Sequence, residues 1–170
     1  MKRIFGPTIY SMIVGRVVLA LLLAGLGFAA TEEEGCETLP ASAPEHINAL
    51  ANTGLSLSRA GKYQVAAKCY RKVLAIDPNI APIQVNLGLA EFKSGSFRDA
   101  IPPLKSAVEL DPENFQALTM LGMTYFGARM YKEAAETLEQ SLAKQPDNVQ
   151  LRFNLAQSLV FSGQYERALT

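Results

Sequence analysis

The sequence predicts an all-α protein, built as an α-solenoid in which helix–turn–helix units repeat along the chain. Three columns of residues, a glycine, an alanine and a proline, recur with a spacing of 34. These are Gly54, Gly88 and Gly122; Ala66, Ala100 and Ala134; and Pro78, Pro112 and Pro146. Between these markers, apolar residues recur every three or four positions, as they do on one face of a helix. A period of this length is typical of helical repeat arrays.

The composition argues against several functional classes. Of the 170 residues, 49% are apolar and 19% are charged, and 16 basic side chains balance 16 acidic ones. A nucleic-acid-binding protein needs a basic excess, so no nucleic-acid partner is expected. His46 is the single histidine, which argues against a histidine-rich metal site and against histidine-based acid–base catalysis. The sequence therefore predicts no enzyme activity, no cofactor and no metal.

Residues 1–29 are predicted to be a secretory signal peptide. Basic side chains precede an uncharged, mostly apolar run at residues 17–30. This run is shorter than the roughly 20 residues that cross a bilayer, and small residues follow it, so cleavage after Ala29 is expected. The alternative is an uncleaved signal anchor over residues 4–30, which would be the only membrane contact. The rest of the chain is expected outside the cytoplasm, periplasmic or secreted.

Residues 30–46 are polar, acidic and interrupted by proline, so they are interpreted as a tether without a face to bury. This linker contains Cys36, and the only other cysteine, Cys69, is predicted in the second helix of the first unit. An exported protein can keep a disulfide. A bond between Cys36 and Cys69 is one interpretation, and two free thiols are the other. His46 is expected to be solvated or near a helix cap.

The rest of the chain divides into helix-pair units. The units are 47–80, 81–114 and 115–148, followed by a shorter fourth one at 149–170. In the second unit the first helix is expected over residues 81–95 and to end at Gly95, where glycine accepts a left-handed backbone. The second helix is expected to begin with a capping box formed by Ser96 and Asp99 and to end at Leu110.

Three further features of the units carry expectations about packing. Gly88 and Gly122 are predicted to let the two helices of a unit approach closely, facing Ala100 and Ala134. Gly61 and Gly163 match the turn glycine Gly95, whereas Arg129 stands at that place in the third unit and predicts a tighter or strained turn. Pro102 and Pro103 remove two backbone donors, so a bend or a late start is expected in the second helix of unit two.

These residues resemble the tetratricopeptide repeat family. In the second unit the family pattern is carried by Leu87-Gly88, Phe92, Ala100, Leu104, Ala107 and Pro112. In the first unit it is carried by Gly54, Ala66, Tyr70 and Pro78. The tryptophan of the family pattern is absent. The resemblance covers about residues 47–170 and implies a right-handed superhelix that binds a protein or peptide segment on its concave face, which the first helix of each unit lines.

The resemblance places a set of side chains on that concave face. They are Asn52, Leu55, Asn86, Leu89, Phe92, Thr119, Met123, Phe126, Phe153, Asn154 and Gln157. The three asparagines share one slot, which Met120 occupies in the third unit. Because an amide both donates and accepts hydrogen bonds, this column is interpreted as a grip on a peptide backbone. The alternative is that each amide bonds within its own helix.

The apolar members of this set have two interpretations. Leu89, Phe92, Met123, Phe126 and Phe153 are either a groove floor for a helix or extended segment or core between the helices. The core interpretation is preferred for the phenylalanines. A chaperone tail held by its terminal carboxylate is not expected. The positions at which relatives hold that carboxylate with Lys and Arg are Ala51, Leu55, Asn86, Gln116 and Met120, of which Asn86 alone matches.

The predicted function is therefore a non-catalytic scaffold that binds a protein or peptide segment in its concave groove, outside the cytoplasm. The sequence ends within the second helix of the fourth unit, so a continuing array or a fragment is expected. This leaves an alternative, the N-terminal interaction module of a larger cell-envelope enzyme or transferase whose catalytic domain lies beyond residue 170. A third interpretation is an array that only spaces or oligomerises.

Overall fold

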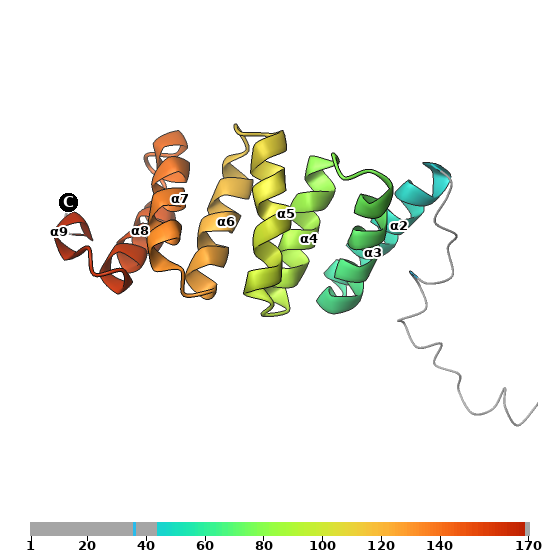
Figure 1. Ribbon diagram of the computed structural model, residues 1–170, viewed down its shortest axis with the longest axis horizontal. Coiled ribbons are helices and arrows are strands. Elements are labelled where there is room, and N and C mark those ends of the chain that lie inside the picture. Colours follow the sequence, from blue (N-terminus) through green and yellow to red (C-terminus); the bar gives the residue numbers. More distant parts are fainter. Residues whose placement is uncertain (1–35, 37–43, 169–170) are drawn as a thin grey trace, which may run out of the picture. The chain divides into compact units, whose positions relative to one another are not determined.

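The computed structural model describes residue 36 and residues 44–168, and this part of the chain is a series of helices (Figure 1). The helices are α2 (Pro44–Arg59), α3 (Tyr63–Ile76), α4 (Ala81–Lys93), α5 (Phe97–Leu110), α6 (Phe115–Gly127), α7 (Tyr131–Lys144), α8 (Val149–Phe161) and α9 (Tyr165–Ala168). The all-α prediction is confirmed for these residues. The predicted signal peptide and most of the linker lie outside the described residues.

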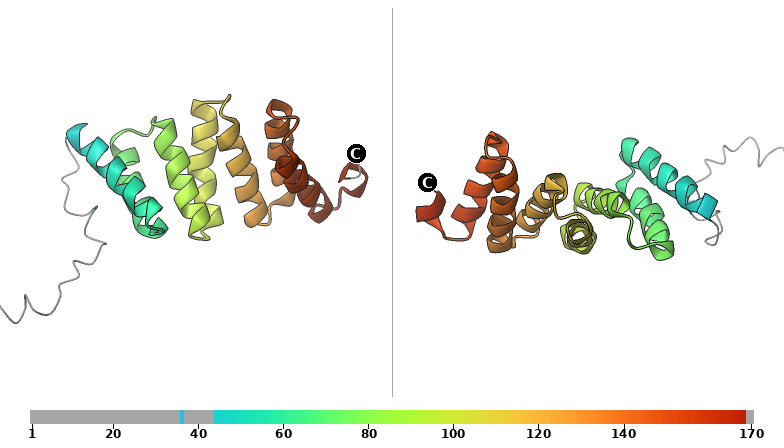
Figure 2. Two further views of the ribbon diagram at one scale, coloured as in Figure 1. Left: turned by 180° about the vertical axis from the view of Figure 1, so that it is seen from behind. Right: turned by 90° about the horizontal axis from the view of Figure 1, so that it is seen from above.

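The helices form two layers. Each first helix, α2, α4, α6 or α8, packs against the second helix that follows it, α3, α5, α7 or α9. The first helices also contact one another, α2 with α4, α4 with α6 and α6 with α8, whereas α3, α5 and α7 make no such contact. The first helices therefore form the inner layer of the array. Figure 2 shows the helices from behind and from above.

The turn inside each unit uses one left-handed residue. Gly95 has a φ of +83°, and its N–H donates to the Phe92 carbonyl at 3.0 Å. Gly61 and Gly163 have the same conformation, and so does Arg129, with a φ of +62°. The N–H of Arg129 donates to the Phe126 carbonyl at 2.9 Å. The expected strain at Arg129 is confirmed, because a side chain disfavours this backbone region, but the same bond closes the turn, which is not tighter.

The predicted capping box and the predicted late start of α5 are wrong, whereas the predicted bend stays a prediction. The helix begins at Phe97, but the side chain of Ser96 makes no capping hydrogen bond. The Asp99 N–H instead donates to the backbone carbonyl of Ser96 at 3.0 Å. Pro102 and Pro103 do not delay the helix, which runs unbroken past them. A proline φ suits a helix, and Pro103 is buried in the packing of α5.

Close packing within each unit depends on the repeated glycine. A Cβ added to Gly122 would lie 2.6 Å from Leu138 Cγ, and one added to Gly54 would lie 2.7 Å from the Tyr70 ring. Gly88 meets Leu104 in the same way. The side chains nearest to Gly88 and Gly122 are therefore leucines rather than the predicted alanines. Ala100 and Ala134 are nonetheless fully buried, as are Leu104 and Leu138.

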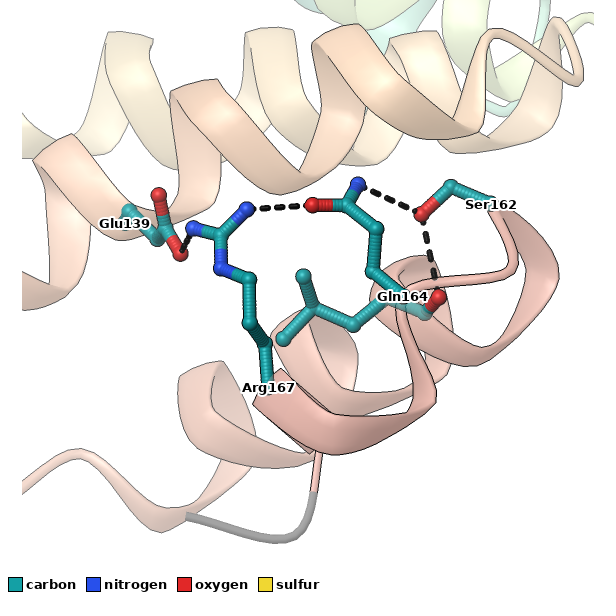
Figure 3. Close-up of polar contacts among 5 residues, drawn as sticks. Glu139, Ser162, Gln164 and Arg167 are labelled. Carbon is teal, nitrogen blue, oxygen red and sulfur yellow. Dashed lines mark hydrogen bonds and ion pairs between the residues drawn. The ribbon is translucent and has the colours of Figure 1, made fainter.

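The start of α9 is held against α7 by polar contacts (Figure 3). The Arg167 guanidinium pairs with the Glu139 carboxylate and donates to the Gln164 side-chain oxygen. The Gln164 amide in turn donates to Ser162 Oγ at 2.9 Å. These side-chain contacts link the start of α9 to Glu139 of α7.

The two cysteines lie together at the first unit. The structure joins Cys36 and Cys69 by a disulfide, with their Cα atoms 5.3 Å apart. Both residues are buried and belong to one apolar cluster with α2, α3 and α4. Lys72 Nζ also donates to the Cys36 carbonyl. The expectation that the whole linker lacks a buried face is therefore wrong at Cys36, and α2 begins at Pro44, within the predicted linker.

Candidate functional site

The inner face of the array is poor in charge from α4 to α8. The first helices α4, α6 and α8 contain three ionisable acidic or basic side chains, Glu91, Lys93 and Arg152. Glu91 is 4% exposed and pairs with Arg71 of α3, so it does not belong to the open surface. The face offered by α6 and α8 is therefore built from apolar side chains, amides and hydroxyls.

A pocket of about 290 Å³ opens between α4, α6 and α8. Its lining residues are Phe92, Phe97, Met123, Phe126, Gly127, Leu138, Asn154 and Gln157. The structure thus brings together the predicted site residues Phe92, Met123, Phe126, Asn154 and Gln157, which come from three different units. Apolar walls with a few amides at one side are the usual construction of a binding pocket.

Aromatic rings form one wall of this pocket. The rings of Phe92 and Phe97 meet edge to face, with centroids 5.3 Å apart. Phe97 also lies over the backbone of Gly127, where an added Cβ would be 2.6 Å from the ring. Phe92 and Phe126 thus contribute to packing and to the pocket wall at once, which combines the two interpretations of these residues.

The asparagine column divides in the structure. Asn154 Oδ1 accepts a hydrogen bond from Gln150 Nε2 at 3.1 Å, one turn earlier in the same helix. Asn52 is exposed and Asn86 is half-buried, and within the described residues neither side chain makes a hydrogen bond. Bonding within the helix therefore accounts for the side-chain oxygen of Asn154 alone. Within the described residues the Nδ2 group of Asn154 and the amides of Asn52 and Asn86 remain open to a ligand.

The other predicted residues do not join the pocket. Thr119 Oγ1 is bonded to Ser141 Oγ at 2.6 Å, so it connects α6 to α7. Leu55 is 36% exposed and Phe153 is 57% exposed. The core interpretation is therefore wrong for Phe153. Leu89 is half-buried and lies outside the pocket lining.

Sequence reasoning missed Phe97, Gly127 and Leu138 as pocket residues. Leu138 and Phe97 belong to second helices, which the resemblance assigns to the outer layer. Gly127 stands outside the repeated glycine column, at the position that Lys93 and Phe161 occupy in neighbouring units. A glycine out of phase with the repeat is the one sequence signal that marks this pocket, because it removes a side chain from the inner face.

An ion pair between the exposed Arg71 and the buried Glu91 joins the first two units. Burial raises the pKa of Glu91, and the Arg71 guanidinium opposes that rise. The equivalent residue of the third unit is Tyr125, and burial also raises its pKa. Sequence reasoning missed Glu91 because an acidic residue at an apolar repeat position has no local marker for its partner. The pair contributes to the contact between units rather than to the pocket.

His46 lies in the first turn of α2, near the helix start as expected, and is half-buried rather than solvated. Its Nδ1 atom is buried and has no hydrogen-bond partner among the described residues. Among the residues that the structure describes, no three His, Cys, Asp or Glu side chains are grouped so that they could bind a metal ion. None of the helices in that part of the chain combines the length and apolarity needed to traverse a bilayer.

Comparison with known families identifies the repeat. One tetratricopeptide repeat model matches residues 51–115 and 85–144, and a second matches residues 125–170. The chain belongs to the tetratricopeptide repeat family. Comparison with curated proteins found no match.

Solved tetratricopeptide structures share this fold. MamA from Desulfovibrio magneticus RS-1 superposes with a TM-score of 0.68 and 24% identity, over 72% of this chain and 70% of that one. The first tetratricopeptide domain of Spaghetti (RPAP3), bound to an HSP90 peptide, has a TM-score of 0.63 and 24% identity, over 69% and 94%. The second tetratricopeptide domain of human RPAP3, in complex with an HSP70 peptide, has a TM-score of 0.61 and 24% identity, over 66% of this chain and 97% of that one. These similarities establish the tetratricopeptide solenoid fold.

Proposed function

We propose that this tetratricopeptide array is a non-catalytic scaffold that binds a peptide or protein segment on its inner face. The observation that carries the proposal is the pocket, which gathers Phe92, Met123, Phe126, Asn154 and Gln157 from three units. The structures of the two RPAP3 domains were solved with bound peptides, which supports the same use of the fold here. The amides of Asn52 and Asn86 extend this surface toward the first unit.

We further propose that the scaffold works outside the cytoplasm. The predicted signal peptide at residues 1–29 supports this location, and so does the disulfide between Cys36 and Cys69, since such bonds persist in oxidising compartments. Mass spectrometry of the chain isolated from its native cells tests both parts. We expect an N-terminus at Ala30 and two alkylatable thiols only after reduction. An N-terminus at Met1 contradicts cleavage, and two thiols free before reduction contradict the oxidised location.

Binding through the inner face is tested with peptides selected from a random library against the 170-residue chain. Affinities are then measured for wild type and for the triple variant Asn52→Ala, Asn86→Ala and Asn154→Ala. Each hydrogen bond contributes about 0.5–1.5 kcal/mol, so the triple variant is expected to bind at least about tenfold more weakly.

The matched control removes amides from the other layer of helices. Gln64 and Gln140 are exposed on α3 and α7, and the variant Gln64→Ala/Gln140→Ala is expected to bind as wild type does. Circular dichroism verifies that both variants keep their helices. Unchanged affinity of a folded triple variant contradicts binding through the inner face, and so does an equal loss in the control.

A further inference from the structure

The third and fourth units contain a closed cluster of three aromatic rings. The rings of Phe126 and Tyr131 meet edge to face, with centroids 5.4 Å apart and planes at 66°. Phe161 of the next unit completes the cluster. Its ring stacks on Tyr131 at 5.1 Å and meets Phe126 edge to face at 5.6 Å. The chain therefore shows how a third ring is accommodated against such a pair.

The second and third units contain the same cluster without its third ring. Phe92 and Phe97 are the equivalents of Phe126 and Tyr131, and they meet with nearly the same geometry, 5.3 Å and 71°. The residue equivalent to Phe161 is Gly127, which has no side chain. Phe97 lies against the backbone of Gly127, and the 290 Å³ pocket opens beside this pair. One cluster is complete within the chain, and the other lacks a ring.

The remaining lining of the pocket defines the chemistry of an occupant. Met123 adds apolar surface, Leu138 lies buried behind the wall, and Asn154 and Gln157 from α8 add two amides. Among the described residues, no acidic or basic side chain lines the pocket. A charged group placed there would lose its hydration without gaining an ion pair. An uncharged occupant with a ring and peptide groups matches both the apolar wall and the amides.

We propose that this pocket receives the aromatic side chain of a partner's uncharged segment. The ring packs against Phe92 and Phe97 in the pocket beside Gly127, as Phe161 packs against Phe126 and Tyr131, and the Asn154 and Gln157 amides bond to the peptide groups beside it. Aromatic rings prefer such edge-to-face and offset arrangements, which add about 0.5–1.5 kcal/mol beyond burial. This inference rests on the proposed function and names the side chain that the inner face selects.

Methionine methyl groups report on the pocket directly. Met123 lines it, whereas Met130 precedes α7 and lies outside the lining. The chain is labelled with carbon-13 at the methionine methyls and titrated with the blocked tripeptide acetyl-Gly-Phe-Gly-amide. We expect a saturable upfield shift of the Met123 signal, because an inserted ring shields a methyl group over its face, and no shift at Met130. Absence of a saturable shift at Met123 overturns the proposal.

Three comparison peptides define the selectivity. Acetyl-Gly-Ala-Gly-amide is expected to leave Met123 unshifted. The two peptides that keep the phenylalanine but have Asp or Lys in place of both glycines are expected to bind no more tightly than acetyl-Gly-Phe-Gly-amide. An equal response to the alanine peptide overturns the aromatic selection. Tighter binding of either charged peptide overturns the preference for an uncharged segment.

Two variants test the place of binding. Gly127→Phe places a ring of the chain itself beside the pocket and is expected to abolish the Met123 response. Since a side chain at Gly127 must displace the Phe97 ring, a second variant, Asn154→Ala/Gln157→Ala, acts at half-buried positions of α8. This variant is expected to bind the phenylalanine peptide two- to tenfold more weakly than wild type does. Unchanged affinity contradicts the role of the amides.

The outcome also separates this inference from the proposed function. If the phenylalanine peptide leaves Met123 unshifted while library-selected peptides still depend on the three asparagines, the aromatic pocket is wrong and the scaffold function stands. If neither kind of peptide depends on the inner face, both are wrong.

Discussion

Replacement of Gly88 by alanine tests the close packing on which each unit depends. An added Cβ would lie 2.7 Å from Leu104 Cδ2 and closer still to Cγ, and Leu104 is fully buried. Overpacking of this kind costs about 1–3 kcal/mol. Alanine inside a helix gains about 1 kcal/mol over glycine. The net loss expected for Gly88→Ala is therefore about 0–2 kcal/mol.

The partner substitution separates these two effects. Leu104→Ala removes a buried leucine and is expected to cost about 2–5 kcal/mol. In the double variant the new Cβ meets no leucine and occupies part of the cavity. The double variant should therefore be more stable than the sum of the single changes by about 1–3 kcal/mol, which is the overpacking cost of the single glycine variant.

Urea unfolding followed by circular dichroism measures these free energies. Gly95→Ala is the control, since its added Cβ has no atom within 4 Å and its cost comes from a φ of +83°. That cost is expected to be about 1–2 kcal/mol and to add to the Leu104→Ala loss without coupling. A Gly88–Leu104 pair that is additive within about 0.5 kcal/mol would refute the packing argument.

Two further predictions concern charge and backbone strain. Because burial raises the pKa of Glu91, ionising this carboxyl costs the folded state free energy as pH rises from about 4 upward. As pH rises from about 4 to 7, the free energy of unfolding of Glu91→Gln should therefore increase relative to that of wild type. A difference in unfolding free energy that does not change with pH in urea titrations would contradict this. Arg71→Ala should destabilise the fold more at about pH 7 than at about pH 4, since only the ionised Glu91 is left as a buried, unpaired carboxylate. Equal losses of stability at these two pH values argue against the ion pair. Arg129→Gly should stabilise by about 1–2 kcal/mol, because Arg129 has a φ of +62°. Thermal unfolding measures this, with Gly95→Ala expected to have the opposite sign; destabilisation by Arg129→Gly would show that no strain is stored there.

The repeat period predicted much of the fold because helix pairing inside a unit is local. The turn residues Gly61, Gly95 and Gly163 and the odd residue Arg129 all take the left-handed conformation that their shared position predicts. The predicted capping box of Ser96 failed for a reason that also follows from geometry. A cap depends on side-chain orientation as well as residue type, and Ser94 Oγ donates to Ser96 Oγ at 3.3 Å instead.

The candidate site was predicted in part, for a similar reason. Position in the repeat decides which face of a first helix a residue occupies, and Phe92, Met123 and Phe126 accordingly meet at the pocket. It does not decide which side chains of second helices reach between first helices. Phe97 does so because Gly127 leaves room for its ring, and this depends on two residues in different units.

The sequence by itself determined the helix order, the repeat units, the turn positions and the face on which a partner is expected, because these follow from spacings within about one repeat length. The tertiary structure decided the pairing of Cys36 with Cys69, the ion pair of Arg71 with Glu91, and the missing ring beside Gly127. Each of these depends on the distance between side chains that come from separate stretches of the chain. Such distances are set by the packing of whole helices, which no local spacing contains.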